Sequence, residues 1–190
     1  MRAFIALELP PEIKEAVSAI QNKLKTSLPG ISWVKPQNLH ITLKFLGGIS
    51  PRQLAETKTI IMQISAITAP FSLKPDGLGV FPGRGQPRII WLGINEDPAV
   101  KGIAASLERE IFKIGIAKEK RDFSGHITIG RVKIPLDPED LEEELKKARN
   151  DLLATNLEFK AMGITLFESV LGGSDGPVYT ALKEANFKIT

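Results

Sequence analysis

The hydrophobic positions in the first half of the chain follow two different periods. Where apolar residues alternate or run together, the pattern predicts strands at residues 2–9, 31–34, 39–46, 71–81 and 88–94. A helical period starts at Pro11, stops at Pro29-Gly30 and gathers on one face Ile13, Ala16, Val17, Ile20 and Leu24. A second helix starts at the capping pair Ser50-Pro51 and continues to about residue 67.

The second half of the chain repeats this order of elements. A helix starts at Pro98, with an apolar face formed by Val100, Ile103, Leu107 and Ile111. Another starts at Pro138 and carries Leu141, Leu145 and Leu152 on its apolar face. Strands are expected around His126 and at residues 157–171 and 178–183.

The two halves match at a shift of 86 or 87 residues. The helix starts at Pro11 and Pro51 recur 87 residues later as Pro98 and Pro138. At a shift of 86 residues the matches are Leu73 with Phe159, Gly77 with Gly163, and Phe81 with Phe167. This period is too long for a solenoid unit and is typical of a duplicated half-domain.

We therefore predict one α+β domain that covers residues 1–190 and consists of two lobes. The lobes correspond to about residues 1–86 and 87–190, allowing for strand exchange between them. We expect the antiparallel sheets of the two lobes to face a central cleft across a pseudo-two-fold axis. The helices then cover the outer faces of the sheets.

Composition narrows the class of protein. The chain is 43% hydrophobic and 25% charged, values that predict a folded globular protein rather than a disordered one. It contains no cysteine, which excludes disulfides, cysteine-ligated zinc and thiol nucleophiles. The apolar start at residues 4–7 is too short for a signal peptide or a membrane span, so we expect a cytoplasmic protein with no membrane partner. The net charge of +3 permits an anionic partner without requiring one.

The chain has two histidines, and both lie in the same tripeptide. These are His40-Ile41-Thr42 and His126-Ile127-Thr128. In a strand, the histidine and the threonine two positions later project to one side, and the isoleucine projects to the other. Two such strands brought together would present two imidazoles and two hydroxyls to one space.

This set of groups suits the hydrolysis of a cyclic phosphodiester. The reaction needs a base to activate water, an acid to protonate the departing oxygen, and donors for the phosphate oxygens. Imidazoles titrate near neutral pH, so one histidine can be neutral while the other is charged. Thr42 and Thr128 supply neutral hydroxyl donors. Two histidines without a carboxylate cluster make a poor metal site, so we expect neither a metal nor another cofactor.

The segments around both histidines resemble the signatures of the 2H phosphoesterases. The first is Trp33-Val34-Lys35-Pro36-Gln37-Asn38-Leu39-His40-Ile41-Thr42-Leu43-Lys44-Phe45-Leu46-Gly47, and the second is Phe123-Ser124-Gly125-His126-Ile127-Thr128-Ile129-Gly130-Arg131. Residues 1–6, 81–93 and 176–179 add to the likeness. Within the superfamily, the chain looks like the bacterial and archaeal RNA 2′,3′-cyclic phosphodiesterases, also called 2′–5′ RNA ligases. Gly125 is a departure, because many relatives have proline before the second histidine.

The resemblance implies a function and the roles of the two histidines. His40 would donate a proton to the 3′ oxygen and His126 would accept one from water, which leaves a 2′-phosphate. The sequence is nearly symmetric between the two, so this polarity is carried by the resemblance alone. The implied partner is RNA with a 2′,3′-cyclic phosphate end, for which tRNA-derived RNA is one candidate. A weak reverse 2′–5′ ligation and a monomeric state are also expected.

Other residues and other functions are weighed beside this interpretation. Arg131 is the best further candidate for a phosphate contact, although a regular strand would turn it away from Thr128. Lys44 is a weaker candidate, and the 83–88 loop is either a cleft rim or a plain hairpin connection. Phe45 and Trp33 are expected in the core or the cleft wall. The alternatives are a cyclic phosphodiesterase acting on small nucleotides and an RNA-end-binding module with residual activity.

Overall fold

A computed structural model describes residues 1–95, 97–155, 157–172 and 176–188. The elements of the first half are β1 (Arg2–Glu8), α1 (Pro11–Ser27), β2 (Ile31–Trp33), the short 3₁₀ helix η1 (Pro36–Asn38), β3 (His40–Gly48), α2 (Pro51–Ala66), β4 (Phe71–Leu73), β5 (Pro75–Phe81) and β6 (Ile89–Ile94). Those of the second half are α3 (Pro98–Lys113), β7 (His126–Val132), α4 (Pro138–Ala154), β8 (Phe159–Ala161), β9 (Gly163–Val170) and β10 (Val178–Asn186). The predicted order of helices and strands is confirmed.

All four α-helices begin with the proline that the sequence analysis identified. Proline suits the first helical turn, because its fixed φ angle is already helical and no partner is needed for its missing N–H group. Three of the helices also have a capping side chain before the proline. Ser50 forms a capping box with Gln53, and Asp97 and Asp137 each accept a hydrogen bond from the first turn.

Eight of the described strands form one antiparallel sheet in the order β10-β9-β1-β3-β7-β6-β5, with β2 paired to β7. β3 and β7, which carry the two motifs, meet at a single residue pair, Ile41 opposite Ile127. The duplicated α+β fold is therefore confirmed, and the sheets of its two lobes join at this one pair. Counted outward from the pair, β3, β1 and β9 correspond to β7, β6 and β5, as the shift of 86 to 87 residues requires.

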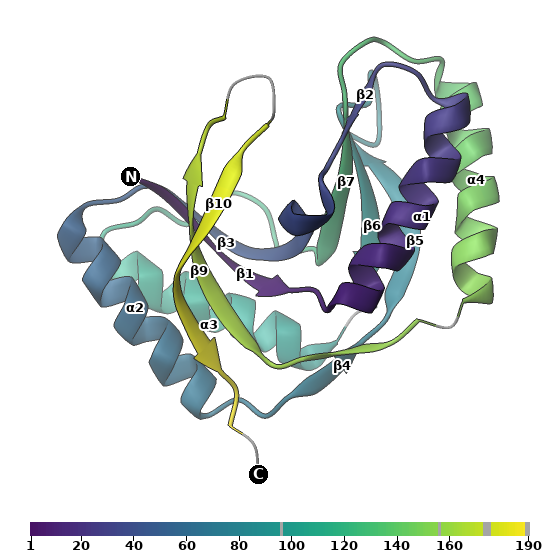
Figure 1. Cartoon of the computed structure of the whole chain (residues 1–190). Helices are drawn as coiled ribbons and strands as arrows, with labels where there is room; N and C mark the ends of the chain where they lie inside the picture. Colours follow the sequence, from purple (N-terminus) through teal and green to yellow (C-terminus); the bar gives the residue numbers. More distant parts are fainter. Residues whose placement is uncertain (96, 156, 173–175, 189–190) are drawn as a thin grey trace.

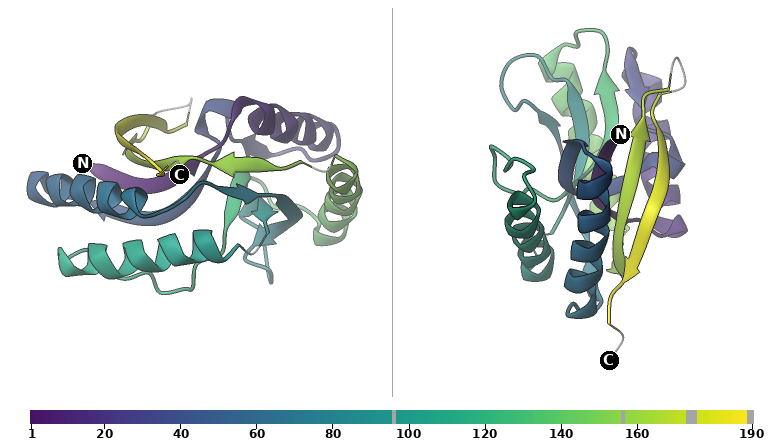
Figure 2. Two further views of the ribbon diagram at one scale, coloured as in Figure 1. Left: turned by 90° about the horizontal axis from the view of Figure 1, so that it is seen from below. Right: turned by 90° about the vertical axis from the view of Figure 1, so that its left-hand side faces the viewer.

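The helices pack in pairs on the outer faces of the two lobes (Figures 1 and 2). α2 and α3 lie together and cover β3, β9 and β10, whereas α1 and α4 cover β7 and β5. Each spatial lobe thus combines strands or helices from both halves of the sequence. None of the helices in the described ranges is both long and apolar enough to cross a membrane.

Two of the expected strands are each divided into two. The segment at 71–81 breaks at Lys74 into β4 and β5, and the segment at 157–171 contains β8 and β9, separated by Met162. β4 and β8 pair with each other in a separate two-stranded sheet. The breaks lie 88 residues apart, within two residues of the shift between the halves, so β4 and β8 are corresponding strands of the two copies.

Candidate active site

The structure brings both motifs to one pocket at the junction of the two lobes. Ile41 and Ile127 are fully buried and form the pair that joins β3 to β7. The residues on either side of them face the other way, and a pocket of about 250 Å³ is lined by His40, Thr42, His126 and Thr128. Because the strands run antiparallel, each histidine lies beside the threonine of the other motif.

Each imidazole is held by a backbone carbonyl two residues earlier in the chain. Nδ1 of His40 lies 2.7 Å from the carbonyl oxygen of Asn38, and Nδ1 of His126 lies 2.8 Å from that of Ser124. A carbonyl oxygen can only accept, so Nδ1 carries the proton and donates it in both rings. Nε2 is therefore the nitrogen left for chemistry in each motif, and that of His40 lies 3.0 Å from the Thr42 hydroxyl.

Aromatic side chains surround the two imidazoles in a duplicated arrangement. The ring of His40 lies 4.8 Å from that of Phe4 and 6.4 Å from that of Phe167, measured between centroids. The ring of His126 lies 6.4 Å from that of Trp91 and 5.2 Å from that of Phe81. Phe4 and Trp91 are 87 residues apart, and Phe81 and Phe167 are 86 residues apart, so the setting was copied together with the motif.

His40 has one further aromatic neighbour, and its environment disfavours the charged form. The ring of Tyr179 meets it edge-on at 5.4 Å. Burial lowers the pKa of the His40 imidazole from 6.5 to about 4, against the opposing effect of the hydrogen bond to Asn38. The positive charges of His126, Arg131 and, more weakly, Lys14 lower it further. Burial also raises the pKa of the Tyr179 phenol, which stays protonated as a donor at neutral pH.

A β-bulge after each motif changes which side chains face the pocket. The register of β1 with β3 skips Leu43, and that of β6 with β7 skips Ile129. The residue three positions after each threonine is thereby turned toward the pocket, so that Phe45 and Arg131 both line it. The pairing is therefore not regular after Thr128, and Arg131, the best further candidate for a phosphate contact, faces the pocket.

Each bulge is secured by a polar side chain from a helix. Gln21 of α1 is buried and donates hydrogen bonds to the carbonyls of Val34 and Ile129, at 2.9 and 2.8 Å. The equivalent residue 87 positions later is Glu108 of α3, which pairs with Lys44 at 2.8 Å. The side chain of Lys44 is only 1% exposed and also donates to the carbonyl of Ala117. Lys44 thus points away from the pocket, and the suggestion that it is a weaker candidate for a phosphate contact is wrong.

Among the described residues, those that line the pocket include positively charged side chains and no carboxylate. Its titratable lining residues are Arg2, His40, His126, Arg131 and Tyr179. Elsewhere in the described residues, no cluster of three histidine, aspartate or glutamate side chains is arranged to hold a metal ion. The pocket therefore has the charge and the donors for an anion such as a phosphate.

Comparison with known protein families detects each half of the chain separately. A family model described as "LigT like Phosphoesterase" matches the chain twice, over residues 7–91 and over residues 92–179. The chain belongs to the LigT-like phosphoesterase family. The two matches start 85 residues apart, close to the shift of 86 or 87 residues found in the sequence. The resemblance to the 2H phosphoesterases is confirmed.

Relatives of similar length share about a third of their residues with this family member. The chain is 36% identical to a protein of Aquifex aeolicus over 97% of its own length and 96% of that protein's. It is 33% identical to one of Methanocaldococcus jannaschii, with 97% and 99% covered. Both are named RNA 2′,3′-cyclic phosphodiesterase.

Solved structures agree in fold along the whole chain. A crystal structure of a Thermus thermophilus protein matches with a TM-score of 0.84 at 27% identity, covering 98% of each chain. Escherichia coli LigT complexed with 3′-AMP matches with a TM-score of 0.75 at 23% identity, covering 99% of this chain and 98% of that one.

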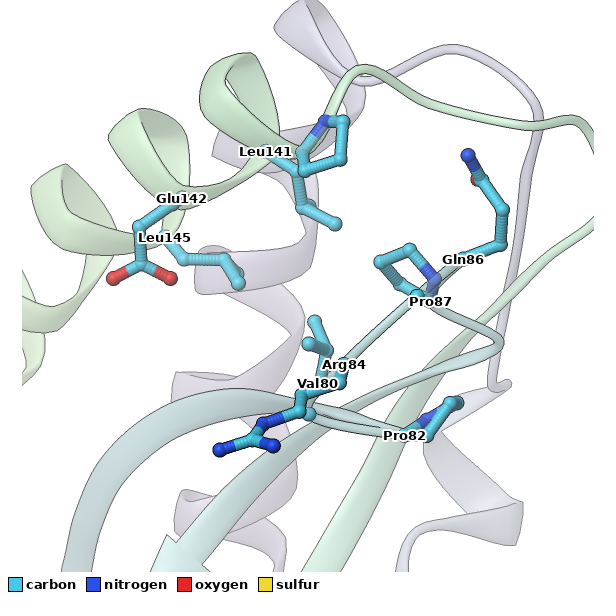
Figure 3. A pocket seen from close by; sticks show the side chains of 11 residues that line it. Val80, Pro82, Arg84, Gln86, Pro87, Leu141, Glu142 and Leu145 are labelled. Carbon is cyan, nitrogen blue, oxygen red and sulfur yellow. The ribbon is translucent and has the colours of Figure 1, made fainter.

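The 83–88 loop of this family member lies away from the motif pocket. Most of it, together with Val80 of β5 and with Leu141 and Leu145 of α4, lines a separate cavity of about 430 Å³ (Figure 3). The two cavities share no lining residue. Val80 faces the helices, whereas the neighbouring Phe81 contacts His126, so the second cavity lies on the outer side of the sheet.

One further feature of the site, the pair of side chains that contact the bulges, was missed by the sequence analysis. The bulge anchors Gln21 and Glu108 could have been found, because each interrupts the apolar face of a helix at the same place in the repeat. Phe45 was expected in the core or the cleft wall; it lines the pocket but is 62% exposed. Trp33, by contrast, packs against the core as expected.

Proposed function

We propose that the chain is an RNA 2′,3′-cyclic phosphodiesterase that works without a metal and leaves a 2′-phosphate end. One observation carries this proposal: two histidines and two threonines from a duplicated motif open into a single pocket, and the described residues that line it include no carboxylate. The names of the relatives in Aquifex aeolicus and Methanocaldococcus jannaschii support the same reaction.

The two Nε2 atoms divide the proton transfers between them. In the proposed reaction a water molecule attacks the phosphorus and gives a proton to His126 as the bond to the 3′ oxygen breaks. His40 protonates the departing 3′ oxygen, and the phosphate stays on the 2′ oxygen. Solvent then exchanges protons with both imidazoles and restores the starting state. The donor and acceptor roles follow the family resemblance, since the two motifs are nearly symmetric.

Because the pKa of His40 is low in the free protein, the proposed mechanism requires the bound substrate to favour its charged form. A proton donor must be charged before it acts, yet burial keeps His40 neutral at pH 7 in the free protein. A phosphodiester brings a negative charge next to Nε2, and an opposite charge at this range favours the imidazolium. Binding of the anion therefore raises the pKa of His40, and the imidazole takes up the proton that it later donates.

The remaining groups of the pocket would hold the substrate. We assign Thr42, Thr128 and Arg131 to the phosphate oxygens, because hydroxyls and a guanidinium donate hydrogen bonds without competing for protons at neutral pH. Phe45 occupies the place equivalent to Arg131 on the other side of the axis and offers an exposed ring. We assign this ring to contact with the base of the terminal nucleotide, since nucleobases stack on exposed aromatic side chains.

Three narrower parts of the proposal stay predictions. Ligation through a 2′–5′ bond would be the reverse reaction at the same site. tRNA-derived RNA is a candidate substrate, and a monomer in the cytoplasm is the expected state. The alternatives are hydrolysis of small cyclic nucleotides alone and binding of RNA ends without turnover.

One assay separates these functions. An oligonucleotide that ends in a 2′,3′-cyclic phosphate and a cyclic mononucleotide are each incubated with dialysed protein and excess EDTA, and the products are separated as 2′- and 3′-phosphates. The proposal expects EDTA-resistant formation of the 2′-phosphate and a bell-shaped dependence of kcat/KM on pH, because one imidazole must be neutral and the other charged. Turnover that is lost with EDTA and restored by a divalent ion would refute it. Affinity that falls with salt, without turnover, would identify a binding module.

A further inference from the structure

Arg2 lines the same pocket as the two histidines but lies outside the catalytic centre. It is the first residue of β1 and lies opposite Gly48 of β3. Strand alternation puts its side chain on the same face of the sheet as Phe4, whose ring lies 4.8 Å from that of His40. Arg2 thus lies two positions along β1 from the aromatic neighbour of His40 and is not in a motif strand.

The guanidinium of Arg2 lies beside open space and has no hydrogen-bond or ion-pair partner among the described residues. Its residue is exposed, and no hydrogen bond or ion pair within the described part of the chain holds its side chain. Gly47 and Gly48, on the neighbouring strand, leave open space, because a Cβ atom built on either one meets nothing within 4 Å. Ser169 of β9 lines the pocket on the other side. The open space beside Arg2 is therefore continuous with the catalytic pocket.

The pocket has more positive side chains than are needed to bind the single negative charge of the cyclic phosphodiester. A cyclic phosphodiester carries one negative charge, and Arg131 lies close enough to the centre to influence the pKa of His40. Arg2 supplies a second guanidinium, and none of the described residues that line the pocket is a carboxylate that could neutralise it. An RNA end carries its next negative charge on the phosphodiester that precedes the terminal nucleotide, and a cyclic mononucleotide has no such group.

We propose that Arg2 binds the internucleotide phosphate immediately before the terminal nucleotide, and so makes the site select RNA ends over cyclic mononucleotides. This inference rests on the proposed function. It names Arg2 as a specificity-determining residue that acts in binding and takes no part in proton transfer. A planar guanidinium suits this task, since it can donate two hydrogen bonds to one phosphate.

The test compares two substrates in three proteins. Wild type, Arg2→Ala and the control Lys146→Ala are assayed on adenosine 2′,3′-cyclic monophosphate and on a trinucleotide with the same cyclic end. Lys146 is a matched control because it is exposed and lies on α4 in the outer helical layer. For Arg2→Ala we expect KM on the trinucleotide to rise about tenfold with kcat unchanged, the size of one charge-assisted hydrogen bond near the surface. Both constants on the mononucleotide stay as in wild type, which also shows that the variant is folded.

A chemical substitution in the RNA checks the same contact from the other side. Replacing the phosphate before the terminal nucleotide with a neutral methylphosphonate is expected to raise KM for wild type by the same factor, and to change nothing for Arg2→Ala. Loss of the contact also makes log(1/KM) on the trinucleotide less dependent on log salt concentration, by about 0.7.

The possible failures are distinct. If wild type hydrolyses both substrates but Arg2→Ala loses activity on both equally, Arg2 belongs to the catalytic centre or the scaffold and the proposal is wrong. The proposal is also wrong if Arg2→Ala matches wild type on the trinucleotide, or if the methylphosphonate effect persists in that variant. If wild type hydrolyses neither substrate, the proposed function has failed instead.

Discussion

Lowering the pH is expected to destabilise the wild-type protein more than a His40→Gln variant. The folded protein holds the pKa of His40 at about 4, whereas the unfolded chain has the ordinary value of 6.5. Between these values the unfolded chain binds the extra proton more readily than the folded protein does, so stability falls as the pH falls. The stabilisation is fully present above pH 6.5 and is lost progressively as the pH approaches 4.

The size of the effect follows from the two pKa values. At pH 7 both states are mostly neutral and the difference between them is close to zero. At pH 4.5 nearly every unfolded chain is protonated at this position, but only about a quarter of the folded molecules are, which corresponds to about 2.5 kcal/mol. Wild type is therefore expected to lose about 2.5 kcal/mol more than His40→Gln between pH 7 and pH 4.5. The remaining titratable groups are the same in both proteins, so their contributions cancel in the comparison.

The assay combines denaturation with a direct titration. Urea unfolding at both pH values gives the free energies, and the His40→Gln variant provides the reference. Because the chain has two histidines, its NMR spectrum shows two imidazole signals, and the variant identifies the one from His40. Tyr179→Ala uncovers the ring and is expected to raise the pKa of His40, since burial is the largest cause of the shift.

Added phosphate completes the test, because the proposed mechanism requires a bound anion to raise the pKa of His40. The reasoning is refuted if the His40 signal titrates near 6.5 in the free protein. It is also refuted if the two proteins lose equal stability on acidification. A pKa that stays low when phosphate fills the pocket would remove His40 from the role of proton donor.

Three further predictions concern the motifs and their support. His40→Ala and His126→Ala are each expected to lower kcat by roughly 10²–10⁴-fold, and the double variant to be little worse, because the pair acts as one unit. Near-normal turnover by either single variant contradicts the mechanism. Thr42→Val and Thr128→Val keep the β-branched shape and are expected to raise the barrier by ~1–3 kcal/mol through loss of a hydroxyl donor, measured as kcat on a cyclic phosphate. Wild-type rates in both variants would show that the two hydroxyls do not contribute to catalysis. Lys44→Met is expected to lower the free energy of unfolding by about 1–3 kcal/mol, since it removes a buried ion pair and a carbonyl partner. An unchanged urea midpoint would show that the bulge does not depend on that pair.

The helices and the two motif strands could be predicted because their signals are local. A proline with a capping residue before it fixes where a helix starts, and an alternation of two residues fixes which side of a strand is buried. The shift between the halves then predicted that the copies would face each other. These inferences need no knowledge of how distant segments pair.

The bulges could not be predicted, because they depend on partners far away in the sequence. Leu43 and Ile129 are aliphatic residues within apolar runs and look like ordinary strand positions. Each becomes an extra residue only when β1 or β6 pairs beside it. The extra residue in each strand also explains why Lys44 is buried and why Arg131 faces the pocket, because it reverses the regular alternation of the side chains that follow it.

The position of the pocket on the pseudo-two-fold axis has a consequence for how it can recognise a directional polymer. Two identical half-length chains that met as a symmetric dimer would give a site whose two ends are the same, and such a site cannot distinguish the 5′ side of an RNA from the 3′ side. Joining the copies in one chain allows equivalent positions to differ. Phe45 and Arg131 are such a pair, with an aromatic ring at one end of the pocket and a guanidinium at the other. The polarity of the site thus depends on the few positions where the two copies have diverged.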